Sequence, residues 1–532
     1  MGIYLNPGNE NFRETANAEI YVDKTMMIEA VNNMMKKGNK YICISRPRRF
    51  GKTITGEMLC AYYSRGCDSG DLFAPYKITS SPSYEEMRNK YNVIRIDMNS
   101  EYQNAGNKEQ FLKELTREII SEFRTAWPGV SFNEDDSLAR SILRVYAATG
   151  ETFVILMDEY DVLVREQASQ ALFEEYLSFL NGLFKSSTVR PAVSLAYLTG
   201  ILPVVRDKIQ SKLNNFREYT ILDAGPLAEF IGFTGEEVKA LCDTHGINFE
   251  ECRRWYDGYS QHGYEIYNPE SVVVCIEQKE FGSYWGKTSS YEVISDRIRM
   301  NFAGTKDAVI RMLAGEEVDV NVTRYLNTMT SFRTKDDLFT YLIHLGYLAY
   351  RRVTGNEGTC RIPNWEVRQE WFNAIEEEEE YAVTSRIISD SKELLKKTLE
   401  GDEQAVAKAL DVSHIHVTSN RSYNNEDALQ SAIYLAYIYA LNRYTIVREM
   451  TAGKGFAGVV FLPVQKTDTA MIIELKKNGN DGGAAGALDQ IRRKQYFDSL
   501  THYQGNLLFV GIDYDEKEKT HTCRMERFYK DQ

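Results

Sequence analysis

The chain has 532 residues, more than the roughly 250–300 at which a single hydrophobic core stops growing, so two or three domains are expected. Hydrophobic residues make up 43% of the sequence and charged residues 26%, which excludes disordered, collagen-like and low-complexity proteins. The formal net charge of −13 means that the whole molecule repels nucleic acid and anionic membranes, so any site for a polyanion must be a local basic patch.

Several features point to the compartment of the protein. No apolar stretch reaches the roughly 18 residues that a membrane-spanning helix needs, and the N-terminal segment MGIYLNPGNENF lacks the pattern of a signal peptide. The eight cysteines form no CxxC pair, and no histidine pair accompanies them at zinc spacing. We therefore expect a cytoplasmic protein with no membrane partner and no structural zinc.

The first 205 residues alternate apolar runs with amphipathic stretches. Four runs have the length and composition of buried strands, at residues 41–45, 92–98, 153–158 and 193–200. This alternation predicts a parallel sheet wrapped by helices. From about residue 230 to 370 the pattern becomes helical, interrupted by the aromatic, glycine-containing segment 253–269.

A run of five glutamates at residues 376–380 precedes a new strand-rich segment. Such a run is usually a solvated helix face, and here it also marks the approach to a third domain. Beyond it the sequence predicts a Tyr-rich helix and three strands, then a Gly-rich loop and a further helix; the Tyr-rich helix covers residues 428–441 and the strands cover 444–450, 457–462 and 470–475.

The first apolar run leads into RPRRFGKTITGEM, where Gly51, Lys52 and Thr53 match the second half of a phosphate-binding P-loop. Backbone amides and the N-terminus of the following helix would bind phosphates there. Lys52 would reach the β and γ phosphates, and the Thr53 hydroxyl would ligate Mg²⁺. Arg46 stands where the motif has its first glycine. A second G-K-T triplet at residues 286–288 follows no strand, so we interpret it as a loop.

About a hundred residues later, the third apolar run ends in Asp158 and Glu159, which is a Walker B pattern. Asp158 would hold the Mg²⁺ shell, and Glu159 would act as the general base toward the attacking water. The alternative is a buried strand that simply exits into a polar loop, and the nearby P-loop triplet weighs against it. Thr199, at the end of the fourth run, is either a sensor of the γ phosphate or part of a Thr-Gly turn.

The remaining candidates for nucleotide contacts flank the triplet. Arg48 and Arg49 are either phosphate ligands or solvated loop charges, and Phe50 and Ile54 adjoin the same loop. An arginine finger cannot be assigned, although Arg206 follows the fourth strand closely in sequence.

Eight short motifs distributed along the chain carry a resemblance: YVDKT (21–25), SRPRRFGKT (45–53), LMDEYD (156–161), LTG (198–200), WYDGY (255–259), YNP (267–269), GYL (346–348) and IPNWEVR (362–368). Together they resemble bacterial and archaeal AAA-ATPase-like proteins that carry a C-terminal nuclease-like domain of the PD-(D/E)XK type. That family tolerates arginine in place of the first P-loop glycine. The resemblance implies that ATP and Mg²⁺ bind, and that ATP is hydrolysed, at Lys52, Thr53, Asp158 and Glu159.

The expected fold class is a multidomain α/β protein. Residues 1–230 would form a P-loop ATPase domain with a parallel sheet, and residues 231–380 a mostly helical, lid-like middle domain. Residues 381–532 would form a PD-(D/E)XK nuclease-like α/β domain.

Nucleases of this type place an Asp at the end of one strand and Glu-x-Lys on the next, so that two carboxylates hold Mg²⁺ while the lysine positions a water. The run MIIELKK supplies Glu474 as a metal ligand and Lys476 as the catalytic lysine. Glu426 and Gln490 match the helix-borne residues that such domains often add. Gly458 occupies the position of the first metal-ligand Asp, and a single carboxylate holds Mg²⁺ poorly.

Two other carboxylates, Glu449 and Asp468, lie close enough in sequence to replace the missing ligand. The local basic patch that nucleic acid would need could come from Lys476, Lys477, Arg492, Arg493 and Lys494. Whether the C-terminal domain cuts DNA or RNA therefore stays open at the level of the sequence.

Three functions are compatible with these motifs. The first is an ATP-hydrolysing switch, either a monomer or an oligomer, that couples its nucleotide state to a C-terminal domain acting on DNA or RNA. The second is a nucleotide-controlled module that binds nucleic acid or protein without cleaving it. The third is a P-loop that binds nucleotide without turnover, which Glu159 argues against because such a site needs no general base.

Overall fold

The computed structural model describes residues 2–203, 215–287, 291–323, 325, 332–355, 357–376, 378–417, 433–452, 455–463, 468–493, 503 and 505–529. The chain forms two compact units. The first unit contains residues 1–304 and 317–370, and the second contains residues 305–316 and 371–532. The expected boundaries at residues 230 and 380 divide the chain more finely than these units and stay a prediction.

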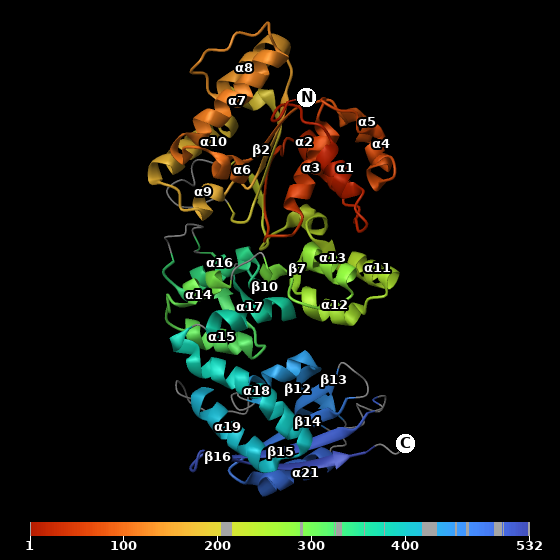
Figure 1. Cartoon of the computed structure of the whole chain (residues 1–532), viewed down its shortest axis with the longest axis vertical. Helices are drawn as coiled ribbons and strands as arrows, with labels where there is room; N and C mark the ends of the chain where they lie inside the picture. The colour runs from red at the N-terminus through yellow and green to blue at the C-terminus, as the bar shows by residue number, and fades with distance from the viewer. Residues whose placement is uncertain are drawn as a thin grey trace. The chain divides into compact units, whose positions relative to one another are not determined.

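A five-stranded parallel sheet forms the centre of the N-terminal part of the first unit (Figure 1). Its strands are β1 (Tyr41–Ser45), β2 (Asn92–Asp97), β3 (Phe153–Asp158), β4 (Val193–Gly200) and the short β5 (Arg217–Tyr219), in the order β2-β3-β4-β1-β5. β1 to β4 coincide with the four predicted apolar runs. β1 and β3 are buried at every residue, and a sheet covered on both faces requires such continuous apolar sequence.

Helices cover both faces of this sheet, with α7, α8 and α10 on one side and α1 to α3 on the other (Figure 1). On α7, Leu115, Ile119 and Phe123 recur every four residues and so share one helix face, and the Phe123 ring stacks on Phe153 of β3 with centroids 5.6 Å apart. The helices are α1 (Glu10–Ala16), α2 (Met26–Lys36), α3 (Lys52–Tyr63), α4 (Gly70–Phe73), α5 (Tyr84–Met87), α6 (Met98–Asn104), α7 (Phe111–Ala126), α8 (Leu138–Thr149), α9 (Val162–Arg165) and α10 (Gln170–Phe184).

The rest of the first unit is mostly helical, as the sequence predicts. It contains α11 (Gly235–His245), α12 (Phe249–Tyr256), α13 (Pro269–Gln278), α14 (Glu292–Ile298), α16 (Lys335–Leu345) and the start of α17 (Trp365–Glu376). Two small sheets were not expected: β6 (Phe233–Thr234), β7 (Tyr259–Gln261) and β8 (Tyr264–Tyr267) form one, and β9 (Val318–Asn321), β10 (Ala349–Thr354) and β11 (Glu357–Arg361) form the other.

The aromatic segment 253–269 forms the end of α12 and the β7–β8 hairpin. Gly258, within this segment, has a φ of +129°, and a Cβ at this position would lie 2.3 Å from the Pro363 carbonyl oxygen. Only glycine allows this close approach. The contact brings the WYDGY and IPNW motifs together in the fold.

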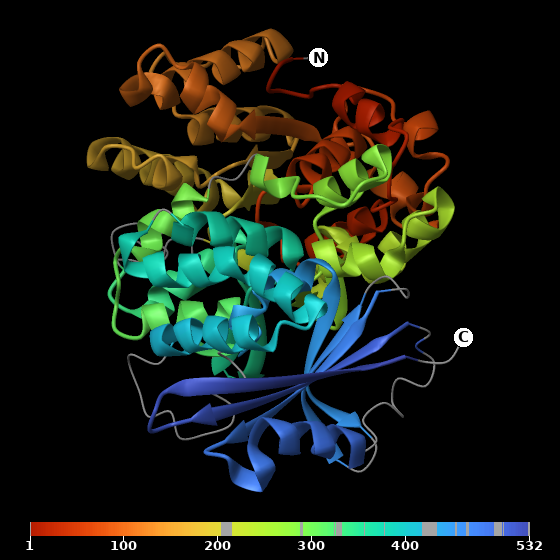
Figure 2. The same ribbon diagram turned by 60° about the horizontal axis from the view of Figure 1, so that its bottom comes forward.

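The second unit is built on a mixed five-stranded sheet in the order β12-β13-β14-β15-β16, with α18 and α19 on one face and α21 on the other (Figure 2). Its strands are β12 (Tyr444–Ala452), β13 (Gly455–Pro463), β14 (Ala470–Lys477), β15 (Leu507–Asp515) and β16 (Thr520–Phe528). Its helices are α15 (Thr305–Leu313), the end of α17, α18 (Ala382–Glu400), α19 (Glu403–Val417) and α21 (Gly483–Arg493). The three strands predicted at residues 444–475 are confirmed.

Side chains along β14 point alternately to the two faces of the sheet, so they contribute to two separate apolar layers of the second unit. Met471 and Ile473 pack with Leu394 of α18 and Leu410 of α19, whereas Ile472 packs with Leu488 and Ile491 of α21. Glu474 is two residues after Ile472, so its side chain lies on the same face of the sheet, the face that α21 covers. The predicted helix over residues 428–441 lies partly outside the described residues; within them, residues 433–436 are α-helical and the 3₁₀ turn Ile438–Asn442 follows.

Candidate functional site

The loop between β1 and α3 begins with Arg46, which stands where the motif has a glycine. Its side chain is fully buried, and Nη1 donates hydrogen bonds to the carbonyl oxygens of Ser45 and Tyr219, both at 2.8 Å. Burial lowers the pKa of the guanidinium to about 10. Arg46 therefore fastens the start of the loop to β5 and leaves the rest of the loop to turn toward α3.

The triplet Gly51-Lys52-Thr53 opens α3. Gly51 has a φ of +84°, a left-handed conformation that favours glycine, and Lys52 is the first residue of the helix. The Lys52 ammonium is buried and donates to the Pro47 carbonyl oxygen at 2.8 Å. Burial lowers its pKa, while the nearby carboxylates of Glu159 and Asp158 oppose that shift. The Thr53 side chain is exposed at the same helix N-terminus.

The acidic pair lies at the same edge of the sheet. β4 is parallel to both β1 and β3 and lies between them, so the carboxyl ends of all three strands meet there. Asp158 is mostly buried, and its Oδ1 accepts hydrogen bonds from the Thr199 hydroxyl and, at 2.9 Å, from the Glu159 amide. Thr199 is thus bonded to the carboxylate that was expected to hold the Mg²⁺ shell.

Two further charged residues enter the site from the short helix α9 and the residue that precedes it, and sequence reasoning missed both. The Asp161 Oδ2 accepts from the amides of Ile201 and Leu202 at 3.0 and 2.7 Å, which fixes the chain beyond β4. Arg165 forms an ion pair with Glu159 and lies 3.4 Å from Asp161, measured from Nε to Oδ1. The signal was present, because Asp161 and Arg165 are four residues apart directly after the acidic pair.

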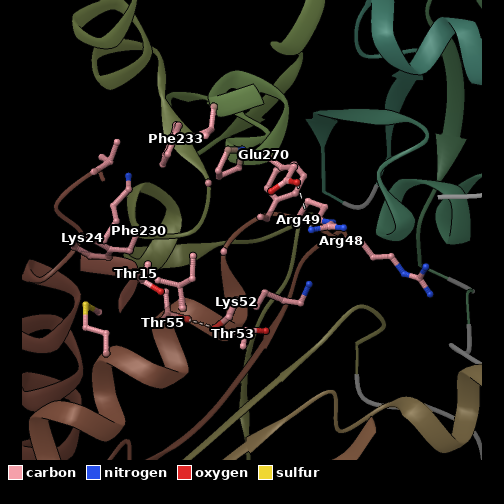
Figure 3. Close-up of a pocket in the computed structure, with 18 of the residues that line it drawn as sticks. Thr15, Lys24, Arg48, Arg49, Lys52, Thr53, Thr55, Phe230, Phe233 and Glu270 are labelled. Carbon is pink, nitrogen blue, oxygen red and sulfur yellow. Dashed lines mark hydrogen bonds and ion pairs between the residues drawn. The ribbon is translucent and has the colours of Figure 1, made fainter. Parts of the chain in front are cut away.

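The loop before α3, the turn after β3 and α9 all contribute residues to one cavity of about 950 Å³ (Figure 3). On the side of the loop, the cavity is lined by residues of the P-loop triplet and its neighbours and by two residues that follow β3: Arg48, Arg49, Phe50, Gly51, Lys52, Thr53, Ile54, Glu159 and Arg165. Apolar residues far away in sequence line it elsewhere, among them Ile20, Tyr21, Val22, Phe230 and Phe233. This volume lies at the upper end of the range of small-molecule sites.

The other predicted loop residues differ in their environment. Phe50 is buried edge-on against Tyr259 with ring centroids 5.4 Å apart, and Ile54 is 41% exposed. The Arg49 guanidinium lies 3.5 Å from the Glu270 carboxylate (Figure 3). Of the second triplet, Gly286 and Lys287 lie in a 3₁₀ turn, and Thr288 lies outside the described residues, as does Arg206.

The YVDKT motif contributes the lysine that closes the apolar side of the cavity. The Lys24 Nζ donates to the Glu229 carbonyl oxygen at 2.5 Å and to the Glu237 carboxylate at 2.6 Å, so it ties residues 20–25 to α11 and to the segment before it. Figure 3 places Lys24 beside Phe230, away from Arg48 and Arg49. The cavity therefore has an apolar end built from two distant segments and a cationic end built from the P-loop.

The second unit brings together the residues expected of a nuclease site. Gln490 of α21 donates through Nε2 to Glu474 Oε1, and its Oε1 accepts from the Lys476 ammonium at 2.5 Å. The Gly458 amide donates to the other Glu474 oxygen at 3.3 Å. Lys476 also forms an ion pair with Asp481 at 3.3 Å. Gln490 thus links Glu474 to Lys476 in one hydrogen-bonded chain beside Gly458.

The substitute carboxylates do not complete a metal site among the described side chains. Asp468 accepts from Arg443 Nη2 at 2.8 Å, so it is engaged elsewhere. Glu426 lies outside the described residues, as does the side chain of Glu449. Within the described part of the chain, no three His, Cys, Asp or Glu side chains are grouped so that they could hold a metal ion.

The basic residues expected to bind nucleic acid have partners of their own. Lys477 pairs with Glu516 at 3.1 Å, and Arg492 pairs with both Asp489 and Glu526. The Arg493 Nε donates to the Asp489 carbonyl oxygen at 3.3 Å, and Lys494 lies outside the described residues. A polyanion would therefore have to compete with these carboxylates.

None of the helices in the described ranges is long and apolar enough to cross a membrane.

Two parts of the chain, one N-terminal and one C-terminal, match models of known protein families. Residues 7–210 match the family model described as a predicted AAA-ATPase, and residues 424–523 match the PD-(D/E)XK nuclease superfamily. A protein of Azotobacter chroococcum mcd 1, described as an uncharacterized protein in the vnfD 5' region, is 26% identical over 286 residues. That match covers 52% of this chain and 52% of the relative, so the chain spans about half the length of the relative.

The solved structures similar to this chain include two proteins of Aeropyrum pernix. The Aeropyrum pernix ORC1 protein in complex with DNA is 12% identical, covers 70% of this chain and 97% of its own, and has a TM-score of 0.24. The ORC2 protein of the same organism, with ADPNP and ADP, is 10% identical, covers 68% of this chain and 97% of its own, and has a TM-score of 0.27. With both family matches, the chain carries an AAA-ATPase-like domain in its N-terminal part and a domain of the PD-(D/E)XK nuclease superfamily in its C-terminal part.

Proposed function

We propose that the first unit binds MgATP in the 950 Å³ cavity and hydrolyses it. The observation that carries this proposal is the shared position of Lys52, Thr53 and Glu159, which all line the cavity although they come from different segments. A helix N-terminus and a buried ammonium favour a polyphosphate, and the adjoining carboxylates suit a divalent cation.

The phosphates would lie at the start of α3. Backbone amides of the loop and the Lys52 ammonium would bind the β and γ phosphates, with Arg48 and Arg49 as further cations beside them. In the present structure the Lys52 ammonium bonds to the Pro47 carbonyl oxygen, which is a weaker acceptor than a phosphate oxygen. We therefore expect Lys52 to exchange that carbonyl oxygen for a phosphate oxygen.

The hydroxyl of Thr53 and the carboxylate of Asp158 fit Mg²⁺, because hard cations prefer oxygen ligands. Bound there, the ion would neutralise the charge of the phosphates during transfer. Glu159 would accept the proton of the water that attacks the γ phosphorus, so that ADP and inorganic phosphate are formed. Burial raises the pKa of Glu159, which makes it a stronger base than an exposed glutamate.

The nucleobase and ribose would occupy the apolar end of the cavity, near Tyr21, Phe230 and Phe233. Because Lys24 ties residues 20–25 to α11 and to the segment before it, both walls of this end are held together.

For the second unit we propose a binding function without cleavage, controlled by the nucleotide state of the first unit. This is favoured by Gly458, which supplies no carboxylate, and by Gln490, which bonds to the carboxylate that remains. A single carboxylate already engaged by an amide is a poor Mg²⁺ ligand set. Nucleic acid is the partner that the superfamily match favours, and a protein partner is the alternative.

Replacing Lys52 with Ala tests the nucleotide site. The variant should bind MgATP about 10- to 100-fold more weakly than wild type, because a charge-assisted bond to phosphate is lost. Lys40→Ala is the matched control, since the Lys40 ammonium also donates to backbone carbonyl oxygens, those of Arg190 and Val193, but lines no part of the cavity. Isothermal titration calorimetry measures both affinities. Equal affinities for Lys52→Ala and wild type would overturn the proposed site.

A further inference from the structure

The turn after β3 holds Glu159 in an uncommon conformation. Its φ is +52°, a left-handed value that is unfavourable for a residue with a side chain. Hydrogen bonds from the Tyr160 amide to the Thr199 carbonyl oxygen and from the Val162 amide to the Glu159 carbonyl oxygen, each 3.0 Å long, close the turn. This turn brings Glu159 back toward α9, where Arg165 lies.

Arg165 then engages the carboxylate that the proposed reaction needs as a base. The ion pair is largely shielded from water, with side-chain exposures of 12% for Arg165 and 23% for Glu159. A carboxylate that is paired with a guanidinium is a weaker proton acceptor, because the cation stabilises its charged form. As long as the pair persists, the Arg165 guanidinium occupies a carboxylate oxygen of Glu159 that would otherwise accept a hydrogen bond from water.

The cavity offers Arg165 another anionic partner. Arg165 lines the cavity together with Gly51, Lys52 and Thr53, and its positive charge acts on the Lys52 ammonium, whose pKa it helps to lower. A γ phosphate bound at the start of α3 would carry more negative charge than Glu159, and guanidinium groups bind phosphate oxygens through paired N–H donors. The second anchor, Asp161, lies 3.4 Å from Arg165 Nε and can keep the side chain in the site during an exchange.

We propose that Arg165 is a positioning residue that holds Glu159 while the cavity lacks a γ phosphate and moves to the γ phosphate when ATP binds. The exchange releases the Glu159 carboxylate to accept the proton of the attacking water, and ADP leaves the ion pair intact. This inference rests on the proposed ATP site and adds to it a device that distinguishes ATP from ADP.

The test compares Arg165→Gln with wild type, using mant-labelled ADP and the non-hydrolysable β,γ-imido analogue of ATP as probes. Arg165→Gln should bind the ATP analogue about tenfold more weakly and ADP within about twofold of wild type, because only the former presents a γ phosphate. Its kcat for MgATP should fall about 100-fold. Arg165→Lys, which keeps the charge, should restore part of the preference for the ATP analogue.

A matched control separates this role from a structural one. Arg144 forms an ion pair with Asp136, 2.6 Å from Nε to Oδ2, in the same unit but outside the cavity. Arg144→Gln should lower stability without changing the ATP-to-ADP affinity ratio.

An unchanged ATP-to-ADP ratio in Arg165→Gln, or a kcat above that of wild type, would overturn the exchange and leave Arg165 as a tether or a simple inhibitor. A wild-type protein that binds neither probe would instead overturn the proposed ATP site itself. The two failures are therefore distinguishable.

Discussion

Replacing Glu159 with Gln should lower kcat for MgATP hydrolysis by about 10²- to 10⁴-fold while MgATP affinity stays within about threefold of wild type. Glutamine keeps the shape of the side chain but cannot accept a proton from water. Because the groups proposed to bind the phosphates (Lys52, the start of α3 and Arg165) are unchanged, the affinity should survive the change. Release of inorganic phosphate under single-turnover conditions measures the chemical step directly.

Glu151→Gln is a suitable control for that experiment. Glu151 precedes the other end of β3 and is paired with Arg65 at 2.7 Å, with 31% of its side chain exposed, so it matches Glu159 in burial and pairing but not in position. Its substitution should leave kcat unchanged. If Glu159→Gln hydrolysed MgATP as fast as wild type, Glu159 would not be the general base.

Replacing Gly458 with Asp should create a binding site for Mn²⁺ or Mg²⁺ in the second unit. Gly458 lies on β13 beside Glu474 of β14, and a Cβ at this position would point toward Glu474, 3.7 Å from its Cα. A second carboxylate there would supply the ligand that hard cations require, and Gln490 would have to release Glu474. We expect the metal affinity to rise at least about tenfold over wild type, followed by metal-dependent cleavage of a nucleic-acid substrate.

The new side chain also meets a steric constraint, because its Cβ would lie 2.9 Å from the Ile473 carbonyl oxygen. Gly458→Asn imposes the same constraint without the charge, so it isolates the ligand effect from the local shift. Mn²⁺ should raise the melting temperature of Gly458→Asp and not that of Gly458→Asn. Equal responses of both variants to Mn²⁺ would show that the absent carboxylate is not what keeps metal from this site.

Much of the fold could be predicted because the strands of a covered sheet read as continuous apolar runs. β3 and β4 have the predicted bounds, and the turn at Gly51 follows from a motif whose geometry requires a left-handed residue. The small sheets escaped prediction because β6 to β8 are two to four residues long and pair through tertiary contacts rather than through a periodic pattern.

The sequence predicted those site residues that belong to short motifs, and it did not predict contacts between distant segments. The P-loop and Walker B motifs identify their functional residues by their order in the sequence, which gave Lys52, Thr53, Asp158 and Glu159. The role of Arg46 could not, because its hydrogen bond to Tyr219 joins residues 173 positions apart. The engagement of Glu474 by Gln490 likewise depends on how α21 packs on the sheet, which sequence spacing does not determine.

The most direct test of the account is steady-state release of phosphate from MgATP by the wild-type chain and by Lys52→Ala. Each would be assayed with and without single- and double-stranded DNA and RNA, and polymer integrity would be followed in the same reactions. The account predicts turnover by wild type that Lys52→Ala lacks, stimulation by the polymer that the second unit binds, and intact polymer throughout. Turnover that persists in Lys52→Ala, or a wild-type chain that releases no phosphate under any of these conditions, would contradict it.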